Sequence, residues 1–195
     1  WQEGSLFALP LNSWYQHFNG SGSEPARFFS VNSMPIVFNL FHSADFIFNT
    51  PRDFTDRFDG DPEYFSGKGK AYPGRVWDTN FIADARSFAL EDWKERGAAG
   101  KNVMLELANG SMAAHISEFP VGTYKKAHRH GPGFNVIIIK GKGFSLFWRE
   151  GEEPKRYDWQ DGSVFTPPAM MFHQHFNTGA TGARYLPPPL GGIKY

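Results

Sequence analysis

The sequence predicts an all-β domain, a sandwich or small barrel, and three observations support this prediction. Short apolar and aromatic runs recur between turn residues, without a long helical pattern, at 103–107, 112–119, 136–139 and 144–148. Aromatic residues make up 17% of the 195 residues, and such rings favour strands and supply large buried areas. Asn109-Gly110 is the dipeptide that most readily supplies both positive φ angles of a type I′ hairpin, and Asp161-Gly162 marks a further turn.

Residues 31–100 are expected to form a connecting region rather than a barrel. They contain several prolines and the loop-like stretch Ser-Gly-Lys-Gly-Lys at 66–70. Near 87–96 the chain has a Ser cap, early acidic residues and late basic residues, and Gly97 follows. This order is typical of a short helix, so one helix is predicted there.

The composition excludes several classes of protein. Twenty Lys plus Arg balance twenty Asp plus Glu, so no broad basic field exists to attract nucleic acid. No apolar run approaches the roughly 20 residues needed to cross a bilayer, so we expect no membrane partner. Cysteine is absent, which removes disulfides and thiolate ligands and favours a cytoplasmic location.

Residues 1–30 repeat part of the C-terminal region. Residues 1–7 (Trp-Gln-Glu-Gly-Ser-Leu-Phe) match 159–165 (Trp-Gln-Asp-Gly-Ser-Val-Phe) at an offset of 158, and 16–19 match 174–177 (both Gln-His-Phe-Asn). The dipeptide Ala-Arg at 26–27 matches 183–184 after a one-residue slip. A repeat at the period of a domain predicts a duplicated domain. We therefore expect a first domain represented by 1–30 and a second domain at 101–195.

The first domain is expected to be incomplete in this chain. Its counterpart of the segment around His128 would lie before Trp1. We expect this N-terminal half to have existed in a parent protein, and to be lost here or supplied as a separate chain. Association with another copy is the alternative, because a half-barrel leaves strand edges that need a partner.

Three histidines form the strongest candidate site. His128 and His130 are two residues apart, so on a strand they point to one face, and His173 lies in the second histidine segment, 168–177. Neutral imidazole is the commonest nitrogen ligand for borderline metals. The pattern indicates one divalent transition metal ion. Iron is expected first, with Mn, Ni, Zn and Cu as alternatives.

These segments resemble the two motifs of the cupin superfamily. The first motif is matched by Gly122, His128, His130 and Gly141, and the second by Gly162, Pro168, His173 and Asn177. Residues 101–186 thus resemble a nearly complete cupin barrel, and 1–30 the second half of another, as in a bicupin. The resemblance implies a double-stranded β-helix barrel, jelly-roll-like, with one metal ion held by His128, His130 and His173.

The chain departs from the family pattern at two places. The family has a Glu, or in some members a His, as a further ligand between the motifs, and this chain has Phe134 and Asn135 there. Asn135 offers a neutral amide oxygen, a weaker donor suited to a long or water-mediated contact. In the first copy Tyr15 stands where the second has His173, so the same site is not expected there.

Three further residues are candidates for contacts around the metal ligands. His175 shares parity with His173, and it is either an additional ligand or proton carrier, or a buried histidine fixed by hydrogen bonds. We favour the buried role because His17 retains this residue type in the copy that lacks the ligand. Tyr124 and Lys126 share parity with His128 and can reach the pocket, although a Lys pair more often forms a solvated edge.

The expected function is that of an enzyme acting on a small molecule. Three imidazoles leave open positions for oxygen and a bidentate substrate, which favours an iron-dependent dioxygenase of an aromatic or enolisable compound. Lyase or isomerase chemistry with Mn, Ni or Zn as Lewis acid is one alternative. A non-catalytic binding or storage protein is the other, because a fold alone does not fix a reaction.

Overall fold

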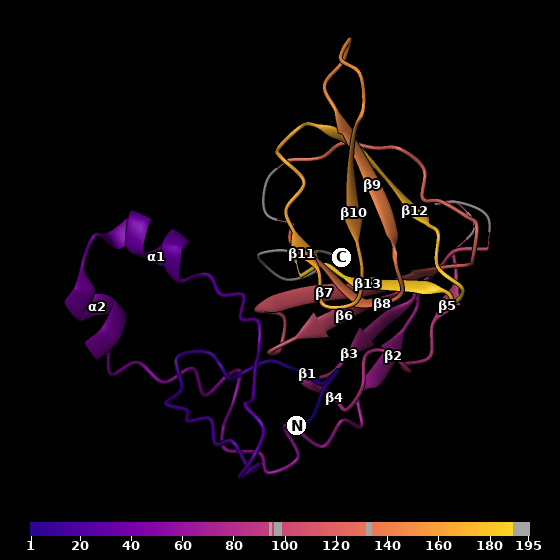
Figure 1. Cartoon of the computed structure of the whole chain (residues 1–195). Helices are drawn as coiled ribbons and strands as arrows, with labels where there is room; N and C mark the ends of the chain where they lie inside the picture. Colours follow the sequence, from indigo (N-terminus) through magenta and orange to yellow (C-terminus); the bar gives the residue numbers. More distant parts are fainter. Residues whose placement is uncertain (94, 96–98, 132–133, 189–195) are drawn as a thin grey trace.

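The computed structural model describes residues 1–93, 95, 99–131 and 134–188, and their regular structure is mostly β (Figure 1). The all-β class predicted from the sequence is confirmed. The strands are β1 (Leu6–Phe7), β2 (Lys70–Tyr72), β3 (Val76–Asp78), β4 (Phe81–Ile82), β5 (Glu91–Asp92), β6 (Lys101–Leu107), β7 (Met112–Phe119), β8 (Val136–Lys140), β9 (Gly143–Trp148), β10 (Lys155–Trp159), β11 (Val164–Phe165), β12 (Phe172–Asn177) and β13 (Ala183–Leu186).

Two sheets form the barrel. The larger has the order β11-β8-β13-β7-β6-β3-β2, with β5 beside β6, and the smaller has the order β10-β9-β12 (Figure 1). The sheets meet through aromatic rings, such as Phe119 of β7 against Trp159 of β10 at 6.4 Å between centroids. Apart from the parallel pair β3 and β6, neighbouring strands are antiparallel. This is the two-sheet barrel that the cupin resemblance implied.

The predicted hairpin at Asn109-Gly110 joins β6 to β7. Leu107 and Met112 are the last paired residues, and the N–H of Ser111 donates to the carbonyl of Ala108 at 3.2 Å. Asn109 and Gly110 have φ values of 52° and 82°, the positive angles that a type I′ turn requires. The sequence prediction is therefore confirmed.

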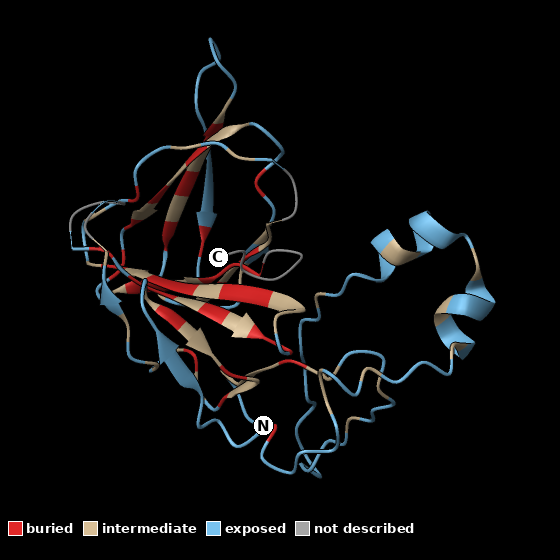
Figure 2. Ribbon diagram, turned by 180° about the vertical axis from the view of Figure 1, so that it is seen from behind, coloured by how far each residue is buried: buried red, intermediate tan, exposed pale blue. Residues whose placement is uncertain are grey.

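Strands β6 and β7 are buried on both faces and form the centre of the core. Leu105 and Ile116 are fully buried on one face, where they pack with Ile82 and Ala85. The barrel interior holds the second cluster, whose buried members are Phe119, Val136, Ile138, Trp159 and Ala183. Figure 2 shows this concentration of buried positions in the strands and the exposure of most of the helical segment.

The helix predicted near 87–96 is wrong over residues 87–93. Glu91 and Asp92 form β5 and pair with Asn102 and Lys101, while residues 94 and 96–98 lie outside the described part of the chain. Phe88 and Leu90 pack against the core. Burial of these side chains and pairing with the edge of β6 outweigh the weak helical preference of the segment.

Two helices that the sequence did not predict lie in the connecting region instead. They are α1 (Met34–Phe41) and α2 (Ala44–Asn49), and neither buries a residue. Both stand away from the barrel in Figures 1 and 2. No helix in the described part of the chain is long and apolar enough to cross a membrane.

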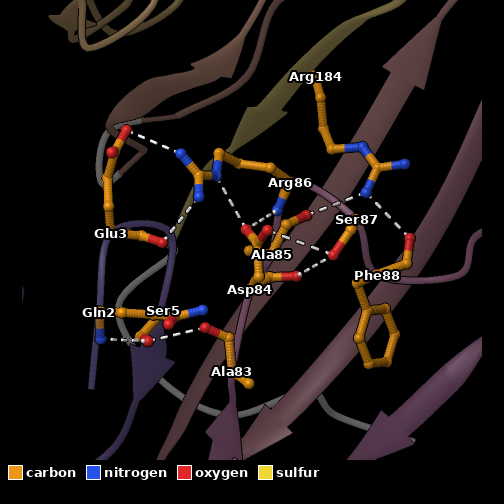
Figure 3. A network of polar contacts seen from close by, with 10 residues as sticks. All are labelled: Gln2, Glu3, Ser5, Ala83, Asp84, Ala85, Arg86, Ser87, Phe88 and Arg184. Atoms are coloured by element: carbon orange, nitrogen blue, oxygen red, sulfur yellow. Dashed lines mark hydrogen bonds and ion pairs between the residues drawn. The ribbon is translucent and has the colours of Figure 1, made fainter.

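Arg184 of β13 connects the barrel to the loop that precedes β5. Its Nε and Nη2 both lie 2.9 Å from a carboxylate oxygen of Glu118 on β7. Its Nη1 donates to the carbonyls of Ala85 at 3.0 Å and Phe88 at 2.9 Å (Figure 3). The guanidinium therefore fixes the loop against the large sheet.

The same loop holds the N-terminal segment. Arg86 pairs with Asp84 at 2.9 Å and with Glu3 at 2.7 Å, and it also donates to the backbone carbonyl of Glu3 (Figure 3). The hydroxyl of Ser5 donates to the carbonyl of Ala83 at 2.7 Å. Residues 1–8 are thus attached to the domain through loop 83–88, and β1 pairs with β4 beside it.

Candidate metal centre

The three predicted histidines come together at one place. His128 and His173 form an antiparallel bridge, in which the N–H of His128 donates at 3.1 Å and that of His173 at 2.9 Å. The ring centroid of His173 lies 4.3 Å from that of His128 and 4.8 Å from that of His130. One candidate ligand atom from each residue lies within 4.8 Å of the other two, so the group could hold a metal ion.

Backbone carbonyls determine which ring nitrogen of each histidine carries the proton. Nδ1 lies 3.0 Å from the carbonyl of Lys126 in His128, 2.8 Å from that of Gly131 in His130, and 3.2 Å from that of Met171 in His173. A carbonyl only accepts hydrogen bonds, so each Nδ1 donates, and the lone pair is on Nε2. In histidines that bind a metal through Nε2, a hydrogen bond from Nδ1 to an acceptor of this kind fixes the tautomer and the orientation of the ring.

The site is buried on one side and open on the other. His173 on β12 is 2% exposed, whereas His128 and His130 are half-buried. Two ligand atoms that bind one ion at ~2.1 Å lie no more than ~4.2 Å apart. The observed upper limit of 4.8 Å is therefore compatible with a shared ion after a small side-chain movement.

No carboxylate joins this histidine group in the described residues. At the position where the cupin resemblance implied a further ligand, the ring of Phe134 lies 4.6 Å from that of His130. Asn135 accepts a hydrogen bond from the hydroxyl of Thr166 at 2.6 Å through Oδ1. The amide oxygen therefore has a partner within the protein, and Phe134 places an apolar surface beside His130.

His175 lies two residues after His173 on β12, and the centroids of the two rings are 5.5 Å apart. It is 4% exposed, and its Nδ1 lies 2.7 Å from the hydroxyl oxygen of Ser145, which also accepts a hydrogen bond from Trp159 at 2.9 Å. Burial lowers the pKa of His175 to about 3, and the nearby His173 contributes in the same direction. The imidazole is therefore neutral near pH 7.

The structure exposes Tyr124 and buries its neighbour Lys125. Tyr124 is 52% exposed, and its ring packs on Phe176, which belongs to the outward face of β12. Lys125 is 2% exposed, with its ammonium group 5.6 Å from the ring centroid of Phe119. The described contacts thus do not bring Tyr124 to the histidine group, and sequence reasoning missed Lys125 as an interior residue.

A local irregularity explains this difference. Tyr124 pairs with Phe176, and His128 pairs with His173. These paired positions are four residues apart in the segment 124–128 but only three residues apart in β12, so the first segment contains one extra residue. An extra residue of this kind is a β-bulge, and it reverses the alternation of side chains beyond it. Parity counted from His128 therefore assigns the wrong face to residues 124–126. The sequence alone gives no pairing between residues 124–128 and 173–176, so the extra residue becomes visible only when the two segments are paired.

Comparisons with known proteins return structures only. No family model and no curated protein matches the chain. Similar solved structures include a cupin 2 conserved barrel domain protein from Rhodopseudomonas palustris, with 21% identity, a TM-score of 0.46 and coverage of 65% of this chain and 81% of that one. A predicted oxalate decarboxylase from Thermotoga maritima gives 18% identity, a TM-score of 0.43 and coverage of 56% and 98%.

An RmlC-like cupin from Shewanella frigidimarina gives 17% identity, a TM-score of 0.44 and coverage of 58% of this chain and 91% of that one. Identities near 20% and TM-scores below 0.5 are too low for any function to be carried over. These similarities also do not confirm a two-barrel arrangement.

Proposed function

We propose that this chain, whose residues 101–186 fold as a cupin barrel, binds one divalent transition metal ion and acts on a small molecule. The main support for this proposal is that His128, His130 and His173 lie together. In each of them Nδ1 is hydrogen-bonded to a carbonyl, which leaves the lone pair on Nε2. Three neutral nitrogen donors suit a borderline metal and leave positions open for a substrate.

The reaction that we propose is oxygenation of an aromatic or enolisable compound with Fe(II). When bound, the metal supplies open positions for oxygen and for a bidentate substrate. Phe134 lies beside His130 and Phe147 lies beside His173, at 6.1 Å between centroids, so the site has apolar walls on these two sides. His175 stays neutral behind His173, so it adds no positive charge that would oppose a cation.

An open surface pocket reaches Phe134, whose ring contacts His130, and we propose that substrate approaches from this side; none of the three histidines lines the pocket. It measures about 280 Å³ and lies between residues 30–32 and Pro35 on one side and Phe134, Asn135 and Thr166 on the other. Its lining combines a ring, an amide and a hydroxyl. Small-molecule sites typically combine apolar walls with a few placed polar groups in this way.

Metal content tests the first part of the proposal. We expect near one equivalent of a transition metal in the purified protein and a large loss in His128→Ala and His173→Ala. His42→Asn is the matched control, because His42 is exposed, lies outside the histidine group, and has a positive φ of 49° that Asn tolerates. Less than about a tenth of an equivalent in the wild-type protein, even after reconstitution, would contradict the proposal.

Oxygen consumption tests the second part. The Fe(II)-loaded protein is expected to consume oxygen in proportion to product formed from candidate aromatic and enolisable substrates. Turnover without oxygen use would overturn the oxygenase assignment and indicate Lewis-acid chemistry with Mn, Ni or Zn. Metal-dependent binding of such compounds without turnover would instead indicate a binding or storage protein.

A further inference from the structure

Residues 1–30 share local backbone structure with residues 159–187 as well as sequence. The N–H of Ser5 donates to the carbonyl of Gln2 at 3.0 Å, and the N–H of Gln2 donates to the hydroxyl of Ser5 at 2.9 Å. The equivalent pair, Ser163 and Gln160, makes the same two hydrogen bonds at 2.9 and 3.0 Å. The turn before β1 therefore copies the turn before β11.

Backbone conformation repeats at two further matched positions. Gly4 and Gly162 have φ values of 87° and 78°, and Asn12 and Met170 have φ values of 52° and 60°. A positive φ is uncommon for residues other than glycine, so its recurrence at Asn12 and Met170 is a specific match. The first copy therefore follows the path of the second through at least residue 12.

The aromatic contacts of the two copies also correspond. In the barrel, His175 contacts Phe165 of β11, Tyr185 of β13 and His173. In the first copy His17 makes the equivalent contacts with Phe7, Phe28 and Tyr15. The ring centroids of Phe7 and His17 are 5.8 Å apart, and those of Phe165 and His175 are 5.9 Å apart. The distance is 4.9 Å for His17 and Phe28, and 5.7 Å for the matched His175 and Tyr185. It is 5.3 Å for Tyr15 and His17, and 5.5 Å for the matched His173 and His175.

What differs between the copies is the set of strand partners. In the barrel, β11 pairs with β8, β12 with β9, and β13 with β7 and β8. All these partners lie within residues 101–158. In the first copy β1 pairs with the short strand β4 instead, and residues 8–33, all of them described, contain no strand. The first copy therefore has the contacts within a half-barrel but lacks those between two halves.

The side chains that the second copy buries are exposed in the first. Tyr15 is 62% exposed, whereas His173 at the matched position is 2% exposed. Trp14 and Phe18 match Phe172 and Phe176, which are half-buried on the outward face of β12, and they are 96% and 74% exposed. Aromatic side chains each carry roughly 150–250 Å² of buriable surface. A contiguous set of them in water indicates an interaction surface.

We propose that residues 1–30 are a preformed half-barrel surface whose partner is a polypeptide of the same type as residues 101–158. Such a partner supplies strands equivalent to β7, β8 and β9, so that residues 14–19 become a paired strand like β12. A second copy of this chain is a poorer partner, because its own 101–158 strands already pair with β11, β12 and β13.

The contacts that hold residues 1–8 also determine where the partner would bind relative to the complete barrel. Arg86 holds Glu3, and β1 pairs with β4, so the half-barrel surface is fixed beside the complete barrel (Figure 3). The partner would therefore complete a second barrel next to the first. Because Tyr15 stands at the position of His173, the completed barrel lacks that imidazole ligand and is a structural companion.

Amide hydrogen exchange of the purified full chain, combined with its mass in solution, is the first test. We expect a monomer in which residues 172–177 are protected and residues 14–19 exchange near the rate of an unfolded chain. Protection of 14–19 in a monomer would mean that the segment packs within its own chain, and would overturn the proposal. Protection that accompanies dimer formation would identify a second copy as the partner and would overturn it as well.

A fusion provides the second test. An added copy of residues 101–158 is placed directly before Trp1, because Asp158 directly precedes Trp159 in the barrel. We expect exchange of residues 14–19 to slow by on the order of 100-fold, with a blue shift in the emission of Trp14 as its ring leaves water. The matched control is the same fusion with Tyr15→Asp, because position 15 corresponds to the buried His173; the charge should remove this protection without changing that of 172–177.

The fusion can fail in a recognisable way. Loss of protection at 172–177 would show that the added segment disturbs the complete barrel, and the segment is then joined through a flexible Gly/Ser linker of about 10 residues. A fusion of either kind that keeps residues 172–177 protected but leaves 14–19 unprotected would overturn the proposal.

Discussion

Replacing Arg184 with Met should cost about 5 kcal/mol of unfolding free energy. Arg184 is 8% exposed and makes two contacts of 2.9 Å with the carboxylate of Glu118. Breaking a buried ion pair costs ~3–5 kcal/mol. The Glu118 side chain is 24% exposed, so water can still reach its carboxylate, and the loss of the Arg184–Glu118 pair should lie near ~3 kcal/mol. The carbonyls of Ala85 and Phe88 also lose a donor, at about 1 kcal/mol each.

Urea unfolding monitored by tryptophan fluorescence measures this loss. Arg156→Met is the matched control, since the Arg156–Asp158 pair has 57% and 72% exposed side chains and should contribute under ~0.5 kcal/mol. Glu118→Met combined with Arg184→Met should recover part of the loss, because the Glu118 carboxylate is then no longer left without its partner. A cost for Arg184→Met below ~1 kcal/mol, or equal to that of the control, would refute the reasoning.

Three further predictions concern the interior. Gly143→Ala should lower stability by several kcal/mol, because its Cβ would overlap the carbonyl of Phe176 and lie 2.6 Å from the Trp159 ring; Gly20→Ala, in open space, is the control in the same urea assay. Trp159→Phe should cost about 1 kcal/mol in that assay by removing the hydrogen bond to Ser145, and an unchanged midpoint would contradict this. His175, with its pKa lowered from 6.5 to about 3, binds fewer protons folded than unfolded between these values, so stability should fall on acidification below about pH 6.5, by up to ~1.4 kcal/mol per pH unit. Urea midpoints between pH 7 and pH 5 measure the slope, which His175→Gln should reduce.

The candidate site was predictable from the sequence to the level of the residues involved. The spacing of His128 and His130, and the second segment with His173, were enough to name the group that the fold brings together. The hairpin at Asn109-Gly110 was predictable for a related reason, because a type I′ turn depends on the φ preferences of two adjacent residues.

The errors arose where distant partners determine the local structure. Residues 87–93 have the capping pattern of a helix, but Phe88 and Leu90 gain more by packing on the core and Glu91 pairs with β6. The Lys125-Lys126 pair was expected to form a solvated edge, because such pairs on strands more often do, and regular alternation placed Tyr124 and Lys126 on the face of His128. The unequal pairing with β12, about 50 residues further along the chain, decides otherwise.

The sequence by itself determined which ligand atom types are present and that the chain contains an internal repeat. Without cysteine, and with three histidines in two spaced segments, any transition metal must be held by imidazole or oxygen, and the repeat of residues 159–165 at 1–7 is a property of residue identity alone. Only the tertiary structure decided that Nδ1 of each of the three histidines faces a backbone carbonyl, that Phe134 borders His130, and that residues 14–19 lack strand partners. These properties depend on carbonyls, rings and strands brought together by long-range pairing, which local residue preferences do not encode.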